Sequence, residues 1–154
     1  MEHLKTSLIH MNFRQTLLAD EETMAYNHAY GGIIEFPEER WEAWYQKWIE
    51  DNSGKKFYRY IQETEKNQFV GEVAYYYEEE SRHYICDVII HDRFRGKGYG
   101  KEGLLFLCEA AKESGITSLY DNIAIDNPSA DLFLKVGFVE EYRTDEYVMV
   151  RKDL

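Results

Sequence analysis

The spacing of apolar residues gives the N-terminal part of the chain a mixed pattern with one strong helix. A first strand is predicted near residues 13–18, and residues 19–26 predict a short helix, which the glycine pair at 31–32 ends. A stronger helix is predicted over residues 37–49, because proline is well tolerated in a first turn. Its aromatic residues recur at the i, i+3, i+4, i+7 spacing of one helical face: Trp41, Trp44, Tyr45 and Trp48. We expect this face to pack into a core.

The middle of the chain changes to strand-like runs. Residues 56–62, 68–77 and 83–91 each combine aromatic and β-branched residues, and a short acidic turn at 78–81 separates the last two. A short turn between two strands indicates an antiparallel hairpin. A helix is then predicted over residues 98–114, where apolar positions return to a helical spacing and Gly115 follows.

The C-terminal part alternates strands with one short helix. The pattern predicts a strand over residues 118–125, a helix over 128–136, and a closing hairpin from 138–142 and 146–151. Strands that mostly follow one another as hairpins, with helices between some of them, are typical of an α+β (mixed α/β) fold with a largely antiparallel sheet.

Length and charge narrow the class of protein. A chain of 154 residues with 44% hydrophobic residues predicts one domain, residues 1–154. Its net charge of −11 disfavours general nucleic-acid binding, which needs a broad basic face. No apolar run approaches the length of a membrane span, and the first residues lack a signal pattern, so we expect a cytoplasmic protein. Cys86 and Cys108 lie within apolar patterns and are expected to be buried free thiols.

One loop carries the strongest chemical signal. Between a strand-like run and a helix, residues 91–103 hold alternating glycines and a group of cations. From Arg93 to Lys101 there are four basic residues and no acidic ones, although the rest of the chain carries a net −15. Glycines allow a ligand to approach the backbone, and the N–H groups at a helix start attract anions. The loop therefore predicts a phosphate-binding cradle.

Three other interpretations of this loop are weaker. A nucleotide-hydrolysing Walker loop needs G-x-x-x-x-G-K-[ST], which is not found here. A dinucleotide fingerprint matches as Gly98, Gly100 and Gly103, with Asp121 downstream, but charged residues separate the strand from the glycines and too few residues follow. A plain strand–helix connection would not need three alternating glycines.

Read as Arg-x-x-Gly-x-Gly, residues 95–100 resemble the GCN5-related N-acetyltransferase (GNAT) superfamily. The resemblance spans about residues 56–152 and includes a second segment, residues 126–138, which is similar to the family's downstream helix ending in Gly-Phe. It implies a twisted, mostly antiparallel sheet of about six to seven strands flanked by about four helices. It also implies transfer of an acetyl group from acetyl-CoA to an amine of a small molecule or peptide, by direct attack in a ternary complex.

The resemblance places the cofactor in the region of residues 83–138. Backbone groups of the strand before the loop would hold the pantetheine arm, and loop amides would bind the diphosphate. Asn127 would contact the cofactor arm, in addition to capping a helix beside Pro128, and Phe133 would pack near the thiol or simply lie in the core. The strand and loop positions are Val88, Ile89, Ile90, Arg95, Gly96, Lys97, Gly98, Tyr99, Gly100 and Lys101.

The chemistry calls for a base and an acid, which the sequence identifies less well. A lysine-like amine, with a pKa of about 10.4, must lose a proton before it attacks. Glu72 and Asp87 are base candidates because acids are unusual within strand patterns, although each could instead face solvent. Many family members have a tyrosine acid where this chain has Phe133, so we predict Tyr142 as the acid. Other candidates stay open: Tyr84, Tyr120, Tyr147, His28, His83, His91 and a covalent route through Cys86.

The acceptor side is expected in the N-terminal quarter. Tyr26 and Tyr30 are predicted to contact the amine, because they fall where the helical pattern lapses before the glycine pair. No metal site is expected from the histidine spacing. A homodimer stays open, and so does an alternative function, a catalytically silent CoA-binding sensor or interaction module.

Overall fold

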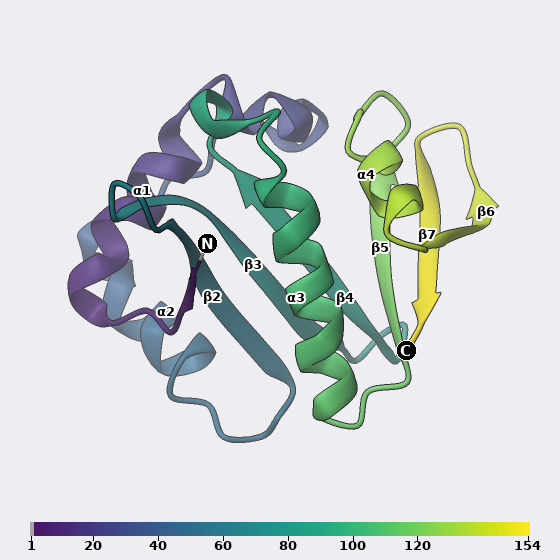
Figure 1. Cartoon of the computed structure of the whole chain (residues 1–154), viewed down its shortest axis with the longest axis horizontal. Coiled ribbons are helices and arrows are strands. Elements are labelled where there is room, and N and C mark those ends of the chain that lie inside the picture. Colours follow the sequence, from purple (N-terminus) through teal and green to yellow (C-terminus); the bar gives the residue numbers. More distant parts are fainter. Residues whose placement is uncertain (1) are drawn as a thin grey trace.

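The computed structural model describes residues 2–154, with Ala29 and Tyr30 described by their backbone alone. Its centre is a sheet with the order β1-β2-β3-β4-β5-β7-β6 (Figure 1). Neighbouring strands are antiparallel, except that β4 and β5 are parallel. The strands are β1 (Glu2–Leu4), β2 (Lys56–Glu63), β3 (Gln68–Glu78), β4 (His83–Ile90), β5 (Ser118–Ala124), β6 (Val139–Arg143) and β7 (Tyr147–Asp153). The predicted fold class is confirmed.

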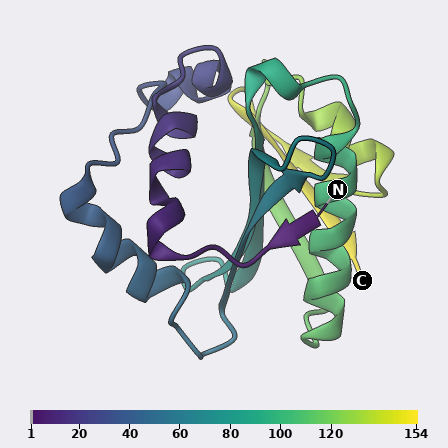
Figure 2. The ribbon, with the colours of Figure 1, turned by 60° about the vertical axis from the view of Figure 1, so that its left-hand side comes forward.

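Helices cover the sheet on both faces (Figure 2). One face carries the N-terminal helices, whose apolar side chains pack on β2, β3 and β4, and the other carries α3 and α4. The α-helices are α1 (Met11–Ala19), α2 (Trp41–Trp48), α3 (Tyr99–Glu113) and α4 (Ala130–Lys135). Short 3₁₀ helices are η1 (Leu8–His10), η2 (Thr23–Tyr30), η3 (Glu38–Arg40) and η4 (Asp92–Phe94).

Most of the predicted elements after residue 37 are found within one or two residues of the expected bounds. The N-terminal predictions are less successful. The strand expected near residues 13–18 is wrong, because this segment forms α1. Its buried residues, Met11, Leu17 and Leu18, lie on one side of that helix, and their spacing is too sparse to distinguish a helix from a strand in the sequence. The helix expected over residues 19–26 is displaced to η2 and wound as a 3₁₀ helix.

The helix α3 lies unusually close to the sheet. A Cβ atom at Gly103 would approach Ile61 Cδ1 to 2.8 Å and Val73 Cγ1 to 3.0 Å. Leu104 and Leu107, on the same helix, are fully buried against this face. The close packing fixes the position of the N-terminal end of α3, where the glycine loop lies.

The strands β4 and β5 share only a short stretch of pairing. Their register has a single matched position, Ile85 with Tyr120, after which the strands diverge (Figure 1). On its other side, β4 pairs with β3 along its whole length. The edge of β4 that faces β5 therefore leaves backbone groups near residues 88–90 without a strand partner.

Candidate active site

The glycine loop brings a row of N–H groups to the start of α3. Gly96 and Gly98 have φ values of +78° and +87°, a left-handed conformation that side chains disfavour. The first bond of the helix runs from the N–H of Glu102 to the carbonyl of Gly98 at 3.1 Å. Among the described residues, the N–H groups of residues 96–101 take part in no hydrogen bond. They form a cradle with the positive end of a helix dipole behind it.

A cavity of about 980 Å³ opens beside this cradle, where β4 and β5 diverge. This volume lies at the upper end of the roughly 300–1,000 Å³ of small-molecule sites. Except for Lys97, every residue predicted to contact the cofactor lines the cavity. Lys97 is exposed at the tip of the loop, with its ammonium 5.8 Å from the Phe94 ring centre. The sequence therefore locates the wall of this cavity well, and the residues fit an elongated ligand that carries phosphate.

Two carboxylates reach the cavity from opposite faces of the sheet. Asp87 on β4 pairs with Ala74, which belongs to the cluster under the N-terminal helices. Asp121 on β5 pairs with Val150, which belongs to the cluster under α3. Directly paired residues share a face, so the two acids point to different sides, and yet both line the cavity. The cavity thus passes between the strands and connects the two faces.

The environment changes the acidity of both carboxyl groups. Asp87 is open to the cavity, but protein surrounds it, and this burial together with the charge of Glu72 raises its pKa to about 6. Arg14 partly offsets this rise. Burial also raises the pKa of Asp121 well above its usual value, and the Asp87 charge raises it further. Near neutral pH, Asp87 can accept a proton and Asp121 holds one more tightly than an ordinary carboxyl group.

Glu72, the other predicted base, lies beneath the cavity wall and not on it. Its side chain is 5% exposed, accepts a hydrogen bond from the Tyr58 hydroxyl, and lies with Oε2 3.4 Å from Arg14 Nε. The Arg14 guanidinium stacks over the rings of Trp44 and Phe36 at 4.6 and 4.7 Å. Glu72 is therefore engaged in a buried ion pair, from which it influences Asp87 by its charge.

Of the residues predicted to contact the acceptor or to act as the acid, one lines the cavity and one does not. Tyr26 lines the cavity on the face of Asp87, and burial together with the nearby carboxylates raises its pKa, so the phenol keeps its proton. The side chain of Tyr30 lies outside the described part of the chain. Tyr142 lies on the edge strand β6 with 46% of its surface exposed, and it is not among the residues that line the cavity. The structure does not bring Tyr142 together with Asp87.

Asn127 and Phe133 contribute to the far wall. Asn127 Oδ1 accepts a hydrogen bond from the N–H of Ser129 at 2.9 Å, in the turn that leads into α4. Phe133 is buried and packs edge to face on Phe138, with ring centres 4.9 Å apart. Each side chain therefore has a structural role and also borders the cavity.

Sequence reasoning overlooked two features of the site. Asp121 was considered only as part of a dinucleotide fingerprint, and the mostly antiparallel sheet excludes the doubly wound fold which that fingerprint requires. The second feature is a contact across the cavity, in which His28 Nε2 lies 2.7 Å from Asp126 Oδ2. The strand pattern could have indicated Asp121, whereas residues that are 98 positions apart give no local signal.

Other sites are not evident in the described residues. In residues 2–154, no three side chains from His, Cys, Asp and Glu are grouped so as to hold a metal ion. The same part of the chain contains no helix that is both long and apolar enough to span a bilayer. Cys86 and Cys108 are buried free thiols, and burial raises the pKa of Cys86, which disfavours a nucleophilic thiolate.

The divided sheet, the amide cradle and the cavity between them define a class of transferase fold. Residues 16–138 match the family described as the acetyltransferase (GNAT) family. This match covers well over half of the chain, which therefore belongs to the GNAT acetyltransferase family. A search of curated proteins finds no match.

Solved structures of this fold are similar along their whole length. They include the spermidine N-acetyltransferase of Vibrio cholerae in complex with CoA and spermine (TM-score 0.76, 19% identity, 99% of this chain and 94% of that one). The ribosomal-protein-alanine N-acetyltransferase of Brucella melitensis gives 0.78 and 19%, with 100% of both chains covered. An N-acetyltransferase of Staphylococcus aureus gives 0.79 and 16%, with 99% and 97% covered. At these identities the likeness shows the fold alone.

Proposed function

We propose that this protein transfers an acetyl group from acetyl-CoA to a primary amine, by direct attack while both substrates are bound. The observation that carries the proposal is the cavity that passes between β4 and β5. The N–H groups of residues 96–101 lie at its mouth, and Asp87 lines it on the face under the N-terminal helices. Family membership and the CoA complexes among similar structures support the same assignment.

Different parts of the site would bind different parts of the two substrates. The N–H groups of residues 96–101 would hold the diphosphate, with the ammonium groups of Lys97 and Lys101 nearby. Backbone groups of residues 88–90, on the unpaired edge of β4, would hold the pantetheine arm and donate to the thioester oxygen. When bound, acetyl-CoA supplies an activated acetyl group. The Asp87 face is left for the amine, beside Tyr26.

Three proton movements complete the reaction. Solvent in the cavity takes one proton from the ammonium form of the acceptor. As the amine attacks, its nitrogen gives a second proton to Asp87, directly or through a water molecule, because this carboxylate is ionised at neutral pH and faces the cavity. A thiolate leaves as the C–S bond breaks and the C–N bond forms. Asp121 lines the cavity on the other face, and burial raises its pKa well above the usual carboxyl value, so it takes the role of donor to that thiolate, where the chain has Phe133 instead of a phenol. Tyr26 stays neutral and positions the amine.

Thiol release from acetyl-CoA tests this function. The protein is incubated with acetyl-CoA and a panel of amines that includes polyamines, lysine and peptides with free N-termini. We expect amine-dependent release of thiol, matched in amount by an acetylated amine in the mass spectrum. If calorimetry shows CoA binding and no amine supports turnover, the silent CoA-binding module is correct and the transferase assignment is wrong.

A further inference from the structure

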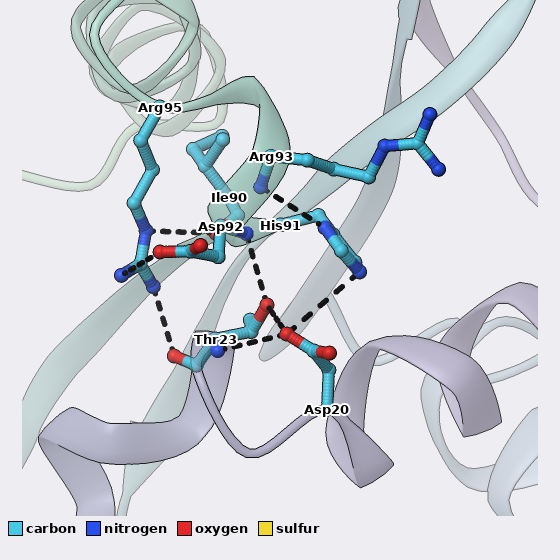
Figure 3. A network of polar contacts seen from close by, with 7 residues as sticks. All are labelled: Asp20, Thr23, Ile90, His91, Asp92, Arg93 and Arg95. Carbon is cyan, nitrogen blue, oxygen red and sulfur yellow. Dashed lines mark hydrogen bonds and ion pairs between the residues drawn. The ribbon is translucent and has the colours of Figure 1, made fainter.

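A buried threonine links the N-terminal segment to the loop that follows β4 (Figure 3). Thr23 is 0% exposed, and its hydroxyl donates a hydrogen bond to Asp20 Oδ2 at 2.6 Å. The same hydroxyl accepts a hydrogen bond from the N–H of Asp92 at 2.9 Å. Because one hydroxyl group serves both partners, Thr23 fixes the start of η2 relative to η4.

Arg95 makes a second connection between the same segments. Its Nε donates to the carbonyl of Ile90 at 3.1 Å, and its Nη2 donates to the carbonyl of Thr23 at 2.8 Å. Its Nη1 lies 3.5 Å from Asp92 Oδ1. The guanidinium of this loop residue is thus committed to protein partners in both segments, unlike that of Arg93, which points away from Thr23 (Figure 3) and lies 5.1 Å from the Phe94 ring centre.

The two connected segments form different walls of the active-site cavity. The chain from Thr23 onward supplies Ala25, Tyr26, Asn27 and His28, which line the acceptor side. The chain from Arg95 onward supplies the N–H groups of the cradle. The contacts of Thr23 and Arg95 therefore join the expected amine site to the expected diphosphate site, and these contacts are short and partly buried.

We infer that Arg95 and Thr23 are positioning residues that couple the two sites: a diphosphate held by residues 96–101 stabilises residues 20–34 and so completes the acceptor wall. This inference rests on the proposed function for the location of CoA. Coupling between binding sites is reciprocal. An acceptor that contacts this wall therefore raises the affinity for CoA by the same factor by which CoA raises the affinity for the acceptor. The two residues act on the amine through the wall and do not touch it.

Hydrogen exchange of the whole protein, with CoA itself as the probe, tests the coupling directly. In the wild type, CoA is expected to slow exchange in residues 95–103 and also in residues 20–34. Thr23→Val should keep the first effect and lose the second, and Arg95→Met, measured at a CoA concentration that saturates the variant, should also lose the second. Thr23→Ser keeps the hydroxyl group and should restore it.

Matched controls separate coupling from a general loss of order. Arg93→Met removes the neighbouring guanidinium, which makes no contact with Thr23, and Thr16→Val removes an exposed hydroxyl that bonds only within α1. Both controls should respond to CoA as the wild type does. A wild type in which CoA protects residues 95–103 alone overturns the inference and leaves the proposed function in place. Equal protection of residues 20–34 in Arg95→Met and Thr23→Val overturns it as well.

Kinetics gives an independent readout once an acceptor amine is found. At saturating acetyl-CoA, Thr23→Val should raise the acceptor KM by about fivefold or more, the lower range of typical site coupling, with little change in kcat. A fall in kcat at constant KM would contradict a positioning role. Failure of CoA to protect any segment of the wild type would overturn the proposed function, and this inference with it.

Discussion

The two walls of the cavity are built on different principles. The α3 wall presents backbone N–H groups, arranged by left-handed glycines and by a helix packed tightly on the sheet. The N-terminal wall presents side chains from a 3₁₀ helix, held in place by Thr23 and Arg95. The first wall suits a ligand group that is common to a family, because backbone groups do not change with sequence. The second can vary with the acceptor.

The largest effect should come from the carboxylate at the junction of the two walls. Asp87→Asn is expected to lower kcat by about 10²–10⁴-fold, the usual contribution of a general base, and to leave CoA affinity unchanged. In the wild type, kcat/KM for the amine should fall as the pH drops through about 6, because protonation removes the base. Stopped assays at a series of pH values measure this fall in kcat/KM. If Asp87→Asn keeps both the wild-type rate and the fall at low pH, the role of Asp87 as the base is contradicted.

The same substitution should stabilise the fold. A carboxyl group whose folded pKa is raised above its unfolded value binds more protons in the native state, so its contribution to stability falls as pH rises from about 4 to about 6. At neutral pH the ionised group therefore opposes folding, and Asp87→Asn removes this penalty. We expect a higher melting temperature at pH 7.5 and a smaller difference at pH 4. A lower melting temperature at pH 7.5 would show that Asp87 is a structural residue.

A matched pair of glycine substitutions addresses the backbone-built wall. Gly98 and Gly54 have φ values of +87° and +79°, and a Cβ atom at either position would meet no neighbour within 4 Å. Valine should therefore cost each position roughly 1–2 kcal/mol of backbone strain. Only Gly98→Val should also weaken CoA, by about 5–30-fold, since 1.4 kcal/mol is a factor of ten. Calorimetric titration of both variants with CoA checks this. If Gly98→Val and Gly54→Val bind CoA with equal affinity, the loop at residues 96–101 does not hold the diphosphate.

Asp121 provides a smaller test on the α3 side of the sheet. A thiol has a pKa of about 8.5, so its thiolate leaves without much assistance. Asp121→Asn should therefore reduce kcat by only about tenfold or less, below the effect at Asp87, and should leave the acceptor KM unchanged. The fall in kcat is compared with that of Asp87→Asn. If Asp121→Asn lowers kcat more than Asp87→Asn does, the roles of base and acid assigned to the two residues must be exchanged.

The contrast between the walls also explains what the sequence could predict. The glycine loop, α3 and the strands from β2 onward follow local rules of periodicity and turn chemistry, and these elements agree with expectation to within a few residues. Residues 88–90 and all the predicted loop residues except Lys97 line the cavity, and their location could be predicted because the role proposed for them depends on backbone groups.

The N-terminal wall could not be predicted in the same way. Its segment from α1 to η2 is fixed by long-range contacts, such as the bond from Arg95 to the Thr23 carbonyl, which join residues 72 positions apart. The sparse apolar positions near residues 13–18 are compatible with either a strand or a helix, and packing on Tyr58 and Tyr60 favours the helix. The presence of both Asp87 and Asp121 at one cavity likewise depends on where β4 and β5 diverge, and no local sequence pattern indicates that position.

The smallest effect is expected at Phe133, the position where the family resemblance implies a tyrosine. Phe133 is buried, borders the cavity, and packs edge to face on Phe138. Phe133→Tyr adds one hydroxyl group without removing this contact. If Asp121 already donates a proton to the thiolate, the new phenol should change kcat by less than about threefold, well below a full general-acid contribution. The effect is best measured in the Asp121→Asn background as well, where the phenol should recover part of the lost rate. A gain of more than tenfold in the otherwise wild-type protein would mean that Asp121 does not serve as the acid and that the site is short of a proton donor.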